Sequence, residues 1–163
     1  MPTGATLAVF DPLNSHPPTT GNARLDLRAG WPVLDFADTT SEATDFIGIV
    51  PSIYSGLGLD LRLSFTATSA TTGAVVWAAK LERVQHGVAD IDGEAFGAEH
   101  ATTTNVAATS GAIASASISV PAADLSGLMA GDVYRLRVRR VAADAADTAT
   151  GDAELVALEV REV

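Results

Sequence analysis

The chain has no cysteine among its 163 residues. Disulfides, thiolate metal sites and thiol catalysis are therefore excluded, and we expect a fold that does not depend on an oxidising compartment. Aromatic residues are also scarce, at 6% of the chain, so the core must be built from Val, Leu, Ile and Ala. The rings of Trp31, Tyr54, Trp77 and Tyr134 are too few and too scattered to predict a cleft in which sugars stack.

Basic residues are outnumbered, with 10 Lys and Arg against 20 Asp and Glu and a net charge of −10. An acidic surface is repelled by phosphate backbones and by anionic lipid, so we predict neither a nucleic-acid nor a membrane partner. The segment 1–5 lacks the basic and apolar parts of a secretory signal. No apolar run approaches the roughly 20 residues of a membrane-spanning helix. We therefore expect a protein made in a cytoplasm.

Sequence signatures of catalysis are missing as well. The chain contains no Gly-x-Ser-x-Gly elbow and neither of the glycine-rich phosphate loops, and its single lysine is Lys80. The three histidines, His16, His86 and His100, fall in predicted loops or near the N-terminus, without a spacing that implies a Ser or Asp partner. We predict a protein that is not an enzyme, with no catalytic residue and no cofactor.

Period-two alternation of apolar and polar side chains is the main positive signal. It is clearest over residues 59–67 and again over 75–82, and the short turn at 71–73 predicts that these two strands form an antiparallel hairpin. Similar patterns recur over 114–120, 134–139 and 154–162. About eight or nine short strands with almost no helix predict an all-β fold, a two-sheet antiparallel β-sandwich of the jelly-roll type. The long irregular stretch 85–111 is a candidate interaction surface.

The first 22 residues form a separate unit in this prediction. Three prolines restrict the backbone over residues 11–22 and remove hydrogen-bond donors, so we expect an extended N-terminal arm over 1–22, followed by the sandwich over 23–163. The arm is either a frayed terminus or a segment that drapes over a neighbouring subunit. Its candidate partner-contact residues are Pro12, Leu13, His16, Pro17 and Pro18.

Three arginines project from one face of one predicted strand: Arg135, Arg137 and Arg139. Bases concentrated in an acidic chain are expected to pair with carboxylates. Cross-strand partners such as Glu159 are one explanation, and acidic groups of a neighbouring subunit are the other. The second explanation makes the three arginines candidate contact residues.

Two acidic stretches resemble metal loops only in part. The segment 90–94, Asp-Ile-Asp-Gly-Glu, has alternating oxygens but lacks the third alternating ligand and the distal bidentate Glu of a calcium loop. A polar turn is the simpler interpretation, and the same holds for Asp144, Asp147 and Asp152. We predict no metal site.

Several segments carry a likeness to known proteins: 32–36, 68–77, 81–83, 90–92, 134–139 and 151–162. Over about residues 31–162 the chain resembles a group of small jelly-roll virion proteins encoded by tailed bacteriophages and prophages. The resemblance implies a structural protein on the surface of the phage particle, assembled in the host cytoplasm. It implies in particular a capsid decoration (cement) protein, a homotrimer that binds the major capsid protein and stabilises the head.

Other functions stay open. The leading alternative is a head or tail fibre module that recognises host-surface glycans, and a stand-alone carbohydrate-binding domain is a further one. A decoration protein should be present in hundreds of copies per particle, whereas a fibre should be present in few. A sugar-binding module should show a saccharide-dependent change in Trp fluorescence.

Overall fold

The structure is a computed structural model that describes residues 4–163. Eleven strands and two short 3₁₀ helices follow one another along the chain: β1 (Thr6–Phe10), η1 (Pro12–Asn14), β2 (Ser15–His16), β3 (Arg24–Arg28), β4 (Trp31–Phe36), β5 (Ala43–Ile49), β6 (Leu59–Ala67), β7 (Ala74–Val84), β8 (His100–Asn105), β9 (Ala114–Val120), η2 (Ala122–Asp124), β10 (Val133–Arg140) and β11 (Ala153–Glu162). No helix within residues 4–163 has the length and apolar character needed to cross a bilayer.

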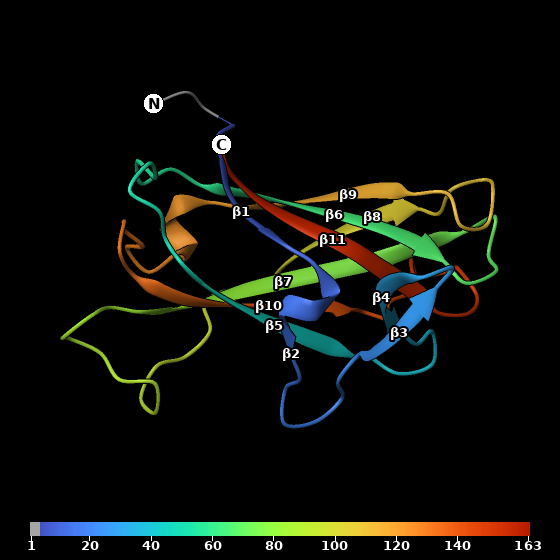
Figure 1. Cartoon of the computed structure of the whole chain (residues 1–163), viewed down its shortest axis with the longest axis horizontal. Coiled ribbons are helices and arrows are strands. Elements are labelled where there is room, and N and C mark those ends of the chain that lie inside the picture. Colours follow the sequence, from blue (N-terminus) through green and yellow to red (C-terminus); the bar gives the residue numbers. More distant parts are fainter. Residues whose placement is uncertain (1–3) are drawn as a thin grey trace.

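The strands form two sheets that pack face to face (Figure 1). The first, sheet A, has the order β3-β4-β11-β6-β9, with β1 added onto β11. The second, sheet B, has the order β2-β5-β10-β7-β8. All pairings between named strands are antiparallel. The predicted two-sheet antiparallel β-sandwich of the jelly-roll type is confirmed.

Alternating side chains of both sheets fill the space between them. Leu59, Leu61, Leu63 and Phe65 of β6 are all buried, while Arg62 between them is exposed. Trp77 of β7 is fully buried and meets Phe65 across the core, with ring centroids 5.4 Å apart. The rings are few, as the composition indicates, and they lie at the centre of the core.

The predicted hairpin of residues 59–67 and 75–82 is wrong. β6 belongs to sheet A and pairs with β9 and β11, whereas β7 belongs to sheet B and pairs with β8 and β10. The connection 68–73 therefore crosses from one sheet to the other. Strands that face each other across a sandwich show the same alternation as strands that pair edge to edge, so the pattern alone could not separate the two arrangements.

The N-terminal segment is part of the sandwich in the structure rather than an arm separate from it. β1 pairs with β11 in sheet A, and β2 pairs with β5 in sheet B. Phe10 is buried and its ring stacks on Phe46, with centroids 5.2 Å apart. The prolines shape the crossing between the sheets, because Pro12 begins η1 and is itself buried. The sandwich thus starts well before residue 23.

Part of the stretch 85–111, which the sequence predicts to be irregular, forms a β-strand in the structure. β8 lies within it and forms the edge of sheet B beside β7. The remaining loop, 85–99, extends from the body near the end of β7 (Figure 1).

Candidate functional site

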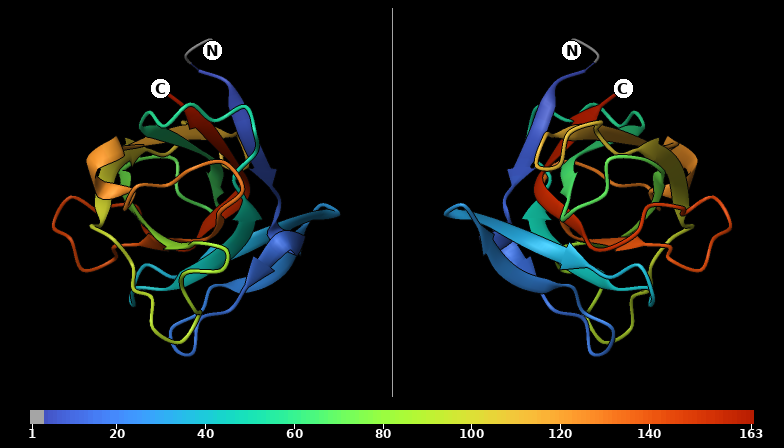
Figure 2. Two further views of the ribbon diagram at one scale, coloured as in Figure 1. Left: turned by 90° about the vertical axis from the view of Figure 1, so that its left-hand side faces the viewer. Right: turned by 90° about the vertical axis from the view of Figure 1, so that its right-hand side faces the viewer.

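The hairpin of β3 and β4 projects from the body of the sandwich (Figure 2). A two-residue turn joins the strands, and both of its residues have positive φ, 49° at Ala29 and 85° at Gly30. This is the geometry of a type I′ turn, whose twist matches that of paired strands. It places Arg28 directly opposite Trp31, at the root of the turn.

Trp31 borders a cavity of about 430 Å³ on the outer face of sheet A. The indole is 68% exposed, which is unusual for the largest apolar side chain. The rest of the lining comes from four other parts of the sandwich and is mostly apolar: Arg28, Ala29, Val33, Thr66, Gly111, Ile113 and Val156. The cavity offers an aromatic wall over an apolar floor, open to solvent.

Arg28 holds the walls of this cavity together. Its Nη1 donates to the carbonyl oxygen of Ala67 (2.7 Å) and to Glu154 Oε2 (3.1 Å). Its Nη2 donates to Ser110 Oγ (3.1 Å), and that hydroxyl donates in turn to the carbonyl oxygen of Thr68 (3.2 Å). The guanidinium thereby ties the projecting hairpin to β6, β11 and the loop before β9, so the cavity is formed without a ligand.

Two polar groups of the lining form no hydrogen bond within residues 4–163. Among residues 4–163, no hydrogen bond is formed by Arg28 Nε, and the Arg28 side chain is 31% exposed. The hydroxyl of Thr66 is buried in the floor and has no hydrogen-bond partner in the described part of the chain. A buried hydroxyl without a partner is costly, but this oxygen is closed off from solvent and offers no direct contact to a ligand.

Two carboxylates lie next to the cavity on the same face of sheet A. Asp35 of β4 stands opposite Glu154 of β11, and both are buried. Burial raises the pKa of Asp35 to about 6, Arg24 opposes the shift, and the charge of Glu154 adds to it. Arg24 Nη2 lies 3.4 Å from Asp35 Oδ2, but the arginine side chain is 74% exposed. Beside the cavity, two buried carboxylates are thus balanced by two arginines.

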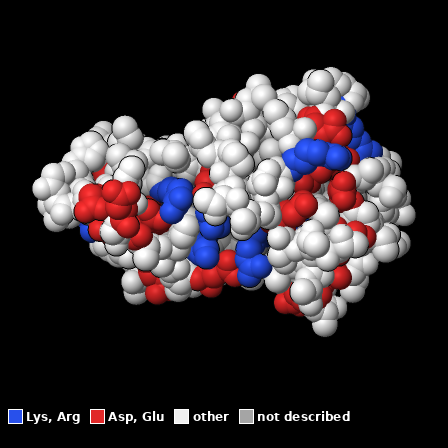
Figure 3. Space-filling model, turned by 90° about the horizontal axis from the view of Figure 1, so that it is seen from below, with Lys and Arg blue, Asp and Glu red and all other residues white. Residues whose placement is uncertain are grey.

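The three arginines predicted as contact residues lie on the outer face of sheet B and are paired within the chain. Arg137 donates twice to Asp45, at 2.7 and 2.9 Å, and Arg139 donates twice to Glu99, at 2.8 and 2.6 Å. Arg135 donates to Glu82 at 2.5 Å. Figure 3 shows basic and acidic side chains lying side by side on this side of the molecule.

The predicted partner Glu159 is wrong, because it lies on β11 in the other sheet, where it accepts a hydrogen bond from Thr6. Sequence alternation places the arginines on one face but cannot say which sheet supplies their acids.

The loop 85–99 covers part of this charged face through one aromatic ring. The ring of Phe96 lies 4.6 Å from the Arg135 guanidinium carbon, 4.7 Å from that of Arg137 and 5.0 Å from Lys80 Nζ. Cations near a ring face are attracted to it. The loop is thus held against sheet B at its C-terminal end.

The candidate contact residues of the N-terminal segment differ in exposure. Leu13 is 68% exposed on η1, and His16 and Pro17 are exposed as well. Pro18 is half-buried, and Pro12 is buried against the sandwich. Whether these side chains contact another protein stays a prediction.

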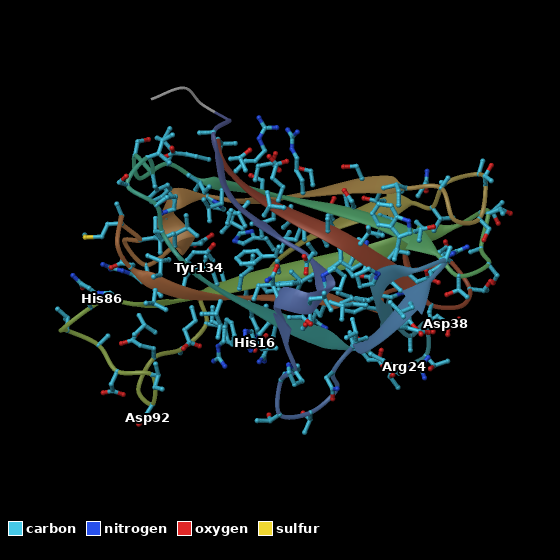
Figure 4. The ribbon with its side chains drawn as sticks, in the orientation of Figure 1. His16, Arg24, Asp38, His86, Asp92 and Tyr134 are labelled. Atoms are coloured by element: carbon cyan, nitrogen blue, oxygen red, sulfur yellow. The ribbon has the colours of Figure 1, made fainter. Side chains whose placement is uncertain are left out.

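The histidines and the acidic loop do not converge on one place. Figure 4 shows His16 near the middle of the molecule, whereas His86 and Asp92 lie on the projecting loop 85–99. Asp90 Oδ1 accepts from the backbone N–H groups of Asp92 (2.9 Å) and Gly93 (2.7 Å), so this segment forms a turn stabilised by its own aspartate. Within residues 4–163 no group of three His, Asp or Glu side chains is placed to hold a metal ion.

Sequence reasoning missed the cavity around Trp31. Its lining comes from β3, β4, β6, β11 and the loop before β9, and only the strand order brings these together. One signal was present: a tryptophan directly after a two-residue turn, where a hairpin tip exposes its side chains.

No protein-family model matches the chain, and no curated protein matches it in sequence. Among solved structures, a Paenibacillus sp. cycloisomaltooligosaccharide glucanotransferase complexed with cycloisomaltoheptaose is similar with a TM-score of 0.50 and 15% identity. The similarity covers 93% of this chain but only 18% of the glucanotransferase chain.

Two single-module structures are similar along their whole length. A carbohydrate-binding module of Cellvibrio mixtus lichenase 5A in complex with cellotriose gives a TM-score of 0.44 at 10% identity, covering 98% of this chain and 99% of that one. The module CBM27-1 of Caldicellulosiruptor saccharolyticus in complex with mannohexaose gives 0.45 at 10% identity, covering 99% and 98%. At these identities the likeness concerns the fold alone.

Proposed function

We propose that this domain is a non-catalytic recognition module that binds a neutral glycan in the cavity beside Trp31. The observation that carries the proposal is the exposed indole on the rim of a preformed, mostly apolar cavity. One face of a pyranose ring presents C–H groups and packs on an aromatic ring, while its hydroxyls need fixed polar partners. The indole of Trp31 supplies the aromatic surface for the C–H groups, and Arg28 Nε supplies a hydrogen-bond donor for a hydroxyl.

The surrounding charges favour a neutral saccharide over an acidic one. Asp35 and Glu154 lie beside the cavity, and the protein carries a net charge of −10. The guanidinium of Arg28 already faces Glu154, at 3.1 Å. Since Arg24 and Arg28 balance these two carboxylates, it is the net charge of the whole protein that opposes a carboxylated or phosphorylated sugar.

The fold is compatible with this role but does not decide it, since β-sandwiches carry many unrelated functions. Some of the similar structures were solved with bound saccharides, namely cycloisomaltoheptaose, cellotriose and mannohexaose. These sugars are sensible first probes. Polysaccharides from bacterial surfaces form the second set, because recognition of host-surface glycans is the alternative that the sequence left open.

The test is a titration followed by intrinsic fluorescence and calorimetry. Trp31 is 68% exposed and Trp77 is fully buried, so a saccharide at the site should protect only the exposed indole from acrylamide quenching. Trp31→Ala should lower the affinity about five- to thirtyfold, since stacking on an aromatic ring contributes on the order of 1–2 kcal/mol. Trp31→Phe should retain part of it.

The matched control is Val88→Ala, which shortens another exposed apolar side chain on the distant loop 85–99. It should bind as the unchanged protein does. If no saccharide in either set binds, or if Trp31→Ala binds as well as the control, the proposal is wrong.

A capsid-decoration role remains a second proposal, and one observation favours it. Leu13 keeps 68% of its side chain exposed on η1, at the surface where the N-terminal segment crosses between the sheets. A leucine in this position is suited to contact another protein. Because β1 and β2 are paired within the chain, the contact would be made by this surface and not by an arm reaching outward.

Counting copies in purified phage particles tests the decoration role. Hundreds of copies, with loss of head stability when the gene is deleted, would support it. A few copies, or none, would contradict it.

A further inference from the structure

The outer edge of β3 is open and made of an unusual five-residue sequence. Within residues 4–163, β3 is the terminal strand of sheet A and pairs only with β4. It reads Arg24-Leu25-Asp26-Leu27-Arg28, the same in both directions. Four of its five residues are exposed, including Leu25 at 52% and Leu27 at 68%. Natural sheets usually cover or shorten an edge strand of this kind.

The turn determines which backbone groups point to the open edge. In a hairpin with a two-residue turn, the two residues next to the turn, here Arg28 and Trp31, form a hydrogen-bonded pair. The following pairs are then non-hydrogen-bonded and hydrogen-bonded in turn. Leu27 faces Pro32, which has no N–H, in agreement with this alternation. The backbone groups of Leu25 and Leu27 therefore face away from β4.

The N–H of Leu27 is already satisfied, because Asp26 Oδ1 accepts from it at 2.7 Å. The open N–H and C=O of Leu25 are the groups best placed to pair with another strand.

We infer that the partner of this edge is β3 of a second copy of the chain, paired antiparallel about Leu25. In that register Leu25 faces Leu25 of the partner, and each Arg24 faces an Asp26. The pairing is limited to these residues, because the N–H of Ala23, which would face Leu27, already donates to the carbonyl oxygen of Ala43 at 2.9 Å. The arrangement puts opposite charges across from each other on one face of the new sheet and leucines across from each other on the other face.

Other symmetric registers fit less well. Centring the pair on Asp26 places the two Asp26 carboxylates opposite each other and sets Arg24 against Arg28, so like charges meet. Centring it on Leu27 makes the N–H that Asp26 already holds the central donor of the pair, and sets Asp26 against Arg28, whose guanidinium already binds Ala67, Glu154 and Ser110. Arg24 is free to turn toward a partner, because its side chain is 74% exposed and its ion pair with Asp35 is long, at 3.4 Å.

The pairing has a consequence for the cavity beside Trp31. A two-fold axis that joins two antiparallel edges into one continuous sheet is perpendicular to that sheet. Both outer faces of sheet A then point the same way, and the two cavities open toward one surface. If the proposed glycan function holds, the dimer would bind a repeating saccharide surface through both sites.

The experiment measures self-association of the full chain without saccharide, by sedimentation from roughly 10 μM to 1 mM, since a contact of one short strand belongs to the small, transient class. The unchanged protein should form dimers within this range. Leu25→Pro removes the open donor without removing a hydrogen bond to β4, and should weaken association at least about tenfold while circular dichroism and melting stay close to those of the unchanged protein. Leu13→Ala, at an equally exposed leucine outside β3, should dimerise normally.

Two charge variants identify the register. Arg24→Asp and Asp26→Arg each place like charges opposite one another, so each should associate at least about tenfold more weakly than the unchanged protein. Mixed together, they restore both Arg–Asp pairs and should form heterodimers. A protein that stays monomeric at 1 mM, dimers that survive Leu25→Pro, or charge variants that do not recombine would overturn the inference. Saccharide binding by the Leu25→Pro monomer tests the glycan proposal separately.

Discussion

Arg140 and Asp147 form an ion pair in which both side chains are almost completely buried, with Nη2 2.6 Å from Oδ1. Arg140 ends β10, and Asp147 lies in the loop that leads to β11. The same guanidinium donates to the carbonyl oxygens of Phe36, Ala149 and Gly151, at 3.2, 2.7 and 2.7 Å. One side chain thereby joins the end of β4 to the loop before β11 and satisfies backbone groups that water cannot reach.

Removing one member of this pair should be among the most damaging single changes in the chain. Asp147→Asn retains the shape but leaves a buried cation without its counter-ion, and we expect a loss of about 3–5 kcal/mol of unfolding free energy. Urea denaturation measures the loss. The control is Asp144→Asn, an exposed acid of the same loop, which should change stability by less than about 0.5 kcal/mol. Equal effects at the two positions would show that the buried pair does not stabilise the loop.

The contribution of Asp35 to stability should be larger in mild acid than at neutral pH. Its pKa is raised to about 6 in the folded chain, chiefly by burial, and lies near 3.9 in an unfolded one. The folded state therefore binds the proton more tightly, and this contribution to stability is present below about pH 4 and is lost as the pH rises through about 6.

Asp35→Asn tests the linkage. The variant should gain on the order of 1 kcal/mol over the unchanged protein at pH 7.5 and little at pH 4, since only the charged carboxylate is costly. Thermal melts at both pH values measure the difference. Asp92→Asn, an exposed acid on the loop 85–99, is the control and should lack this pH dependence. A gain for Asp35→Asn that is the same at both pH values would exclude Asp35 as its source.

The fold class follows from the sequence because alternation records which side of a strand meets the core. Leu61, Leu63 and Phe65 are buried and Arg62 is exposed, as the pattern predicts. The pairing of strands was harder to predict. The strands that contain Phe65 and Trp77 show the same alternation whether they are neighbours in one sheet or face each other across the core. The prolines of the first 22 residues indicated an irregular path, but not that Phe10 would fill the core against Phe46.

The candidate site could not be predicted for a similar reason. Trp31, Thr66 and Val156 lie far apart in sequence and meet only because β4, β11 and β6 are neighbours in sheet A. Leu25 and Leu27 alternate with polar residues as core residues do, yet both are exposed because β3 lies at the sheet's edge. Alternation reports the face of a strand and says nothing of whether another layer covers that face.

The ring of Phe96 should control the mobility of the loop 85–99. It is the aromatic contact of that loop with the cations of sheet B, at 4.6–5.0 Å from three of them. Phe96→Ala should raise amide hydrogen exchange over residues 85–99 and leave the exchange of β10 unchanged, with a loss of global stability near 1 kcal/mol. Val88→Ala removes an exposed side chain from the same loop and should leave exchange unaltered. Faster exchange in both variants would mean that the ring is not the anchor.

Gly73 should be intolerant of any side chain, because it lies where the chain crosses from sheet A to sheet B. Its φ is +91°, and a Cβ there would come within 2.9 Å of the backbone nitrogen of Ala149 and 3.0 Å of its Cα. Neither the backbone strain nor the close contact with Ala149 can relax without moving the loop that Arg140 and Asp147 hold in place. Gly73→Ala should therefore lower the free energy of unfolding by about 2–4 kcal/mol in chemical denaturation. Gly30→Ala is the control: its φ is also positive, at +85°, but a Cβ meets nothing within 4 Å, so only the backbone penalty of about 1–2 kcal/mol applies. If the two variants lose the same amount, the close approach at Ala149 contributes nothing and the crossing is looser than its geometry indicates.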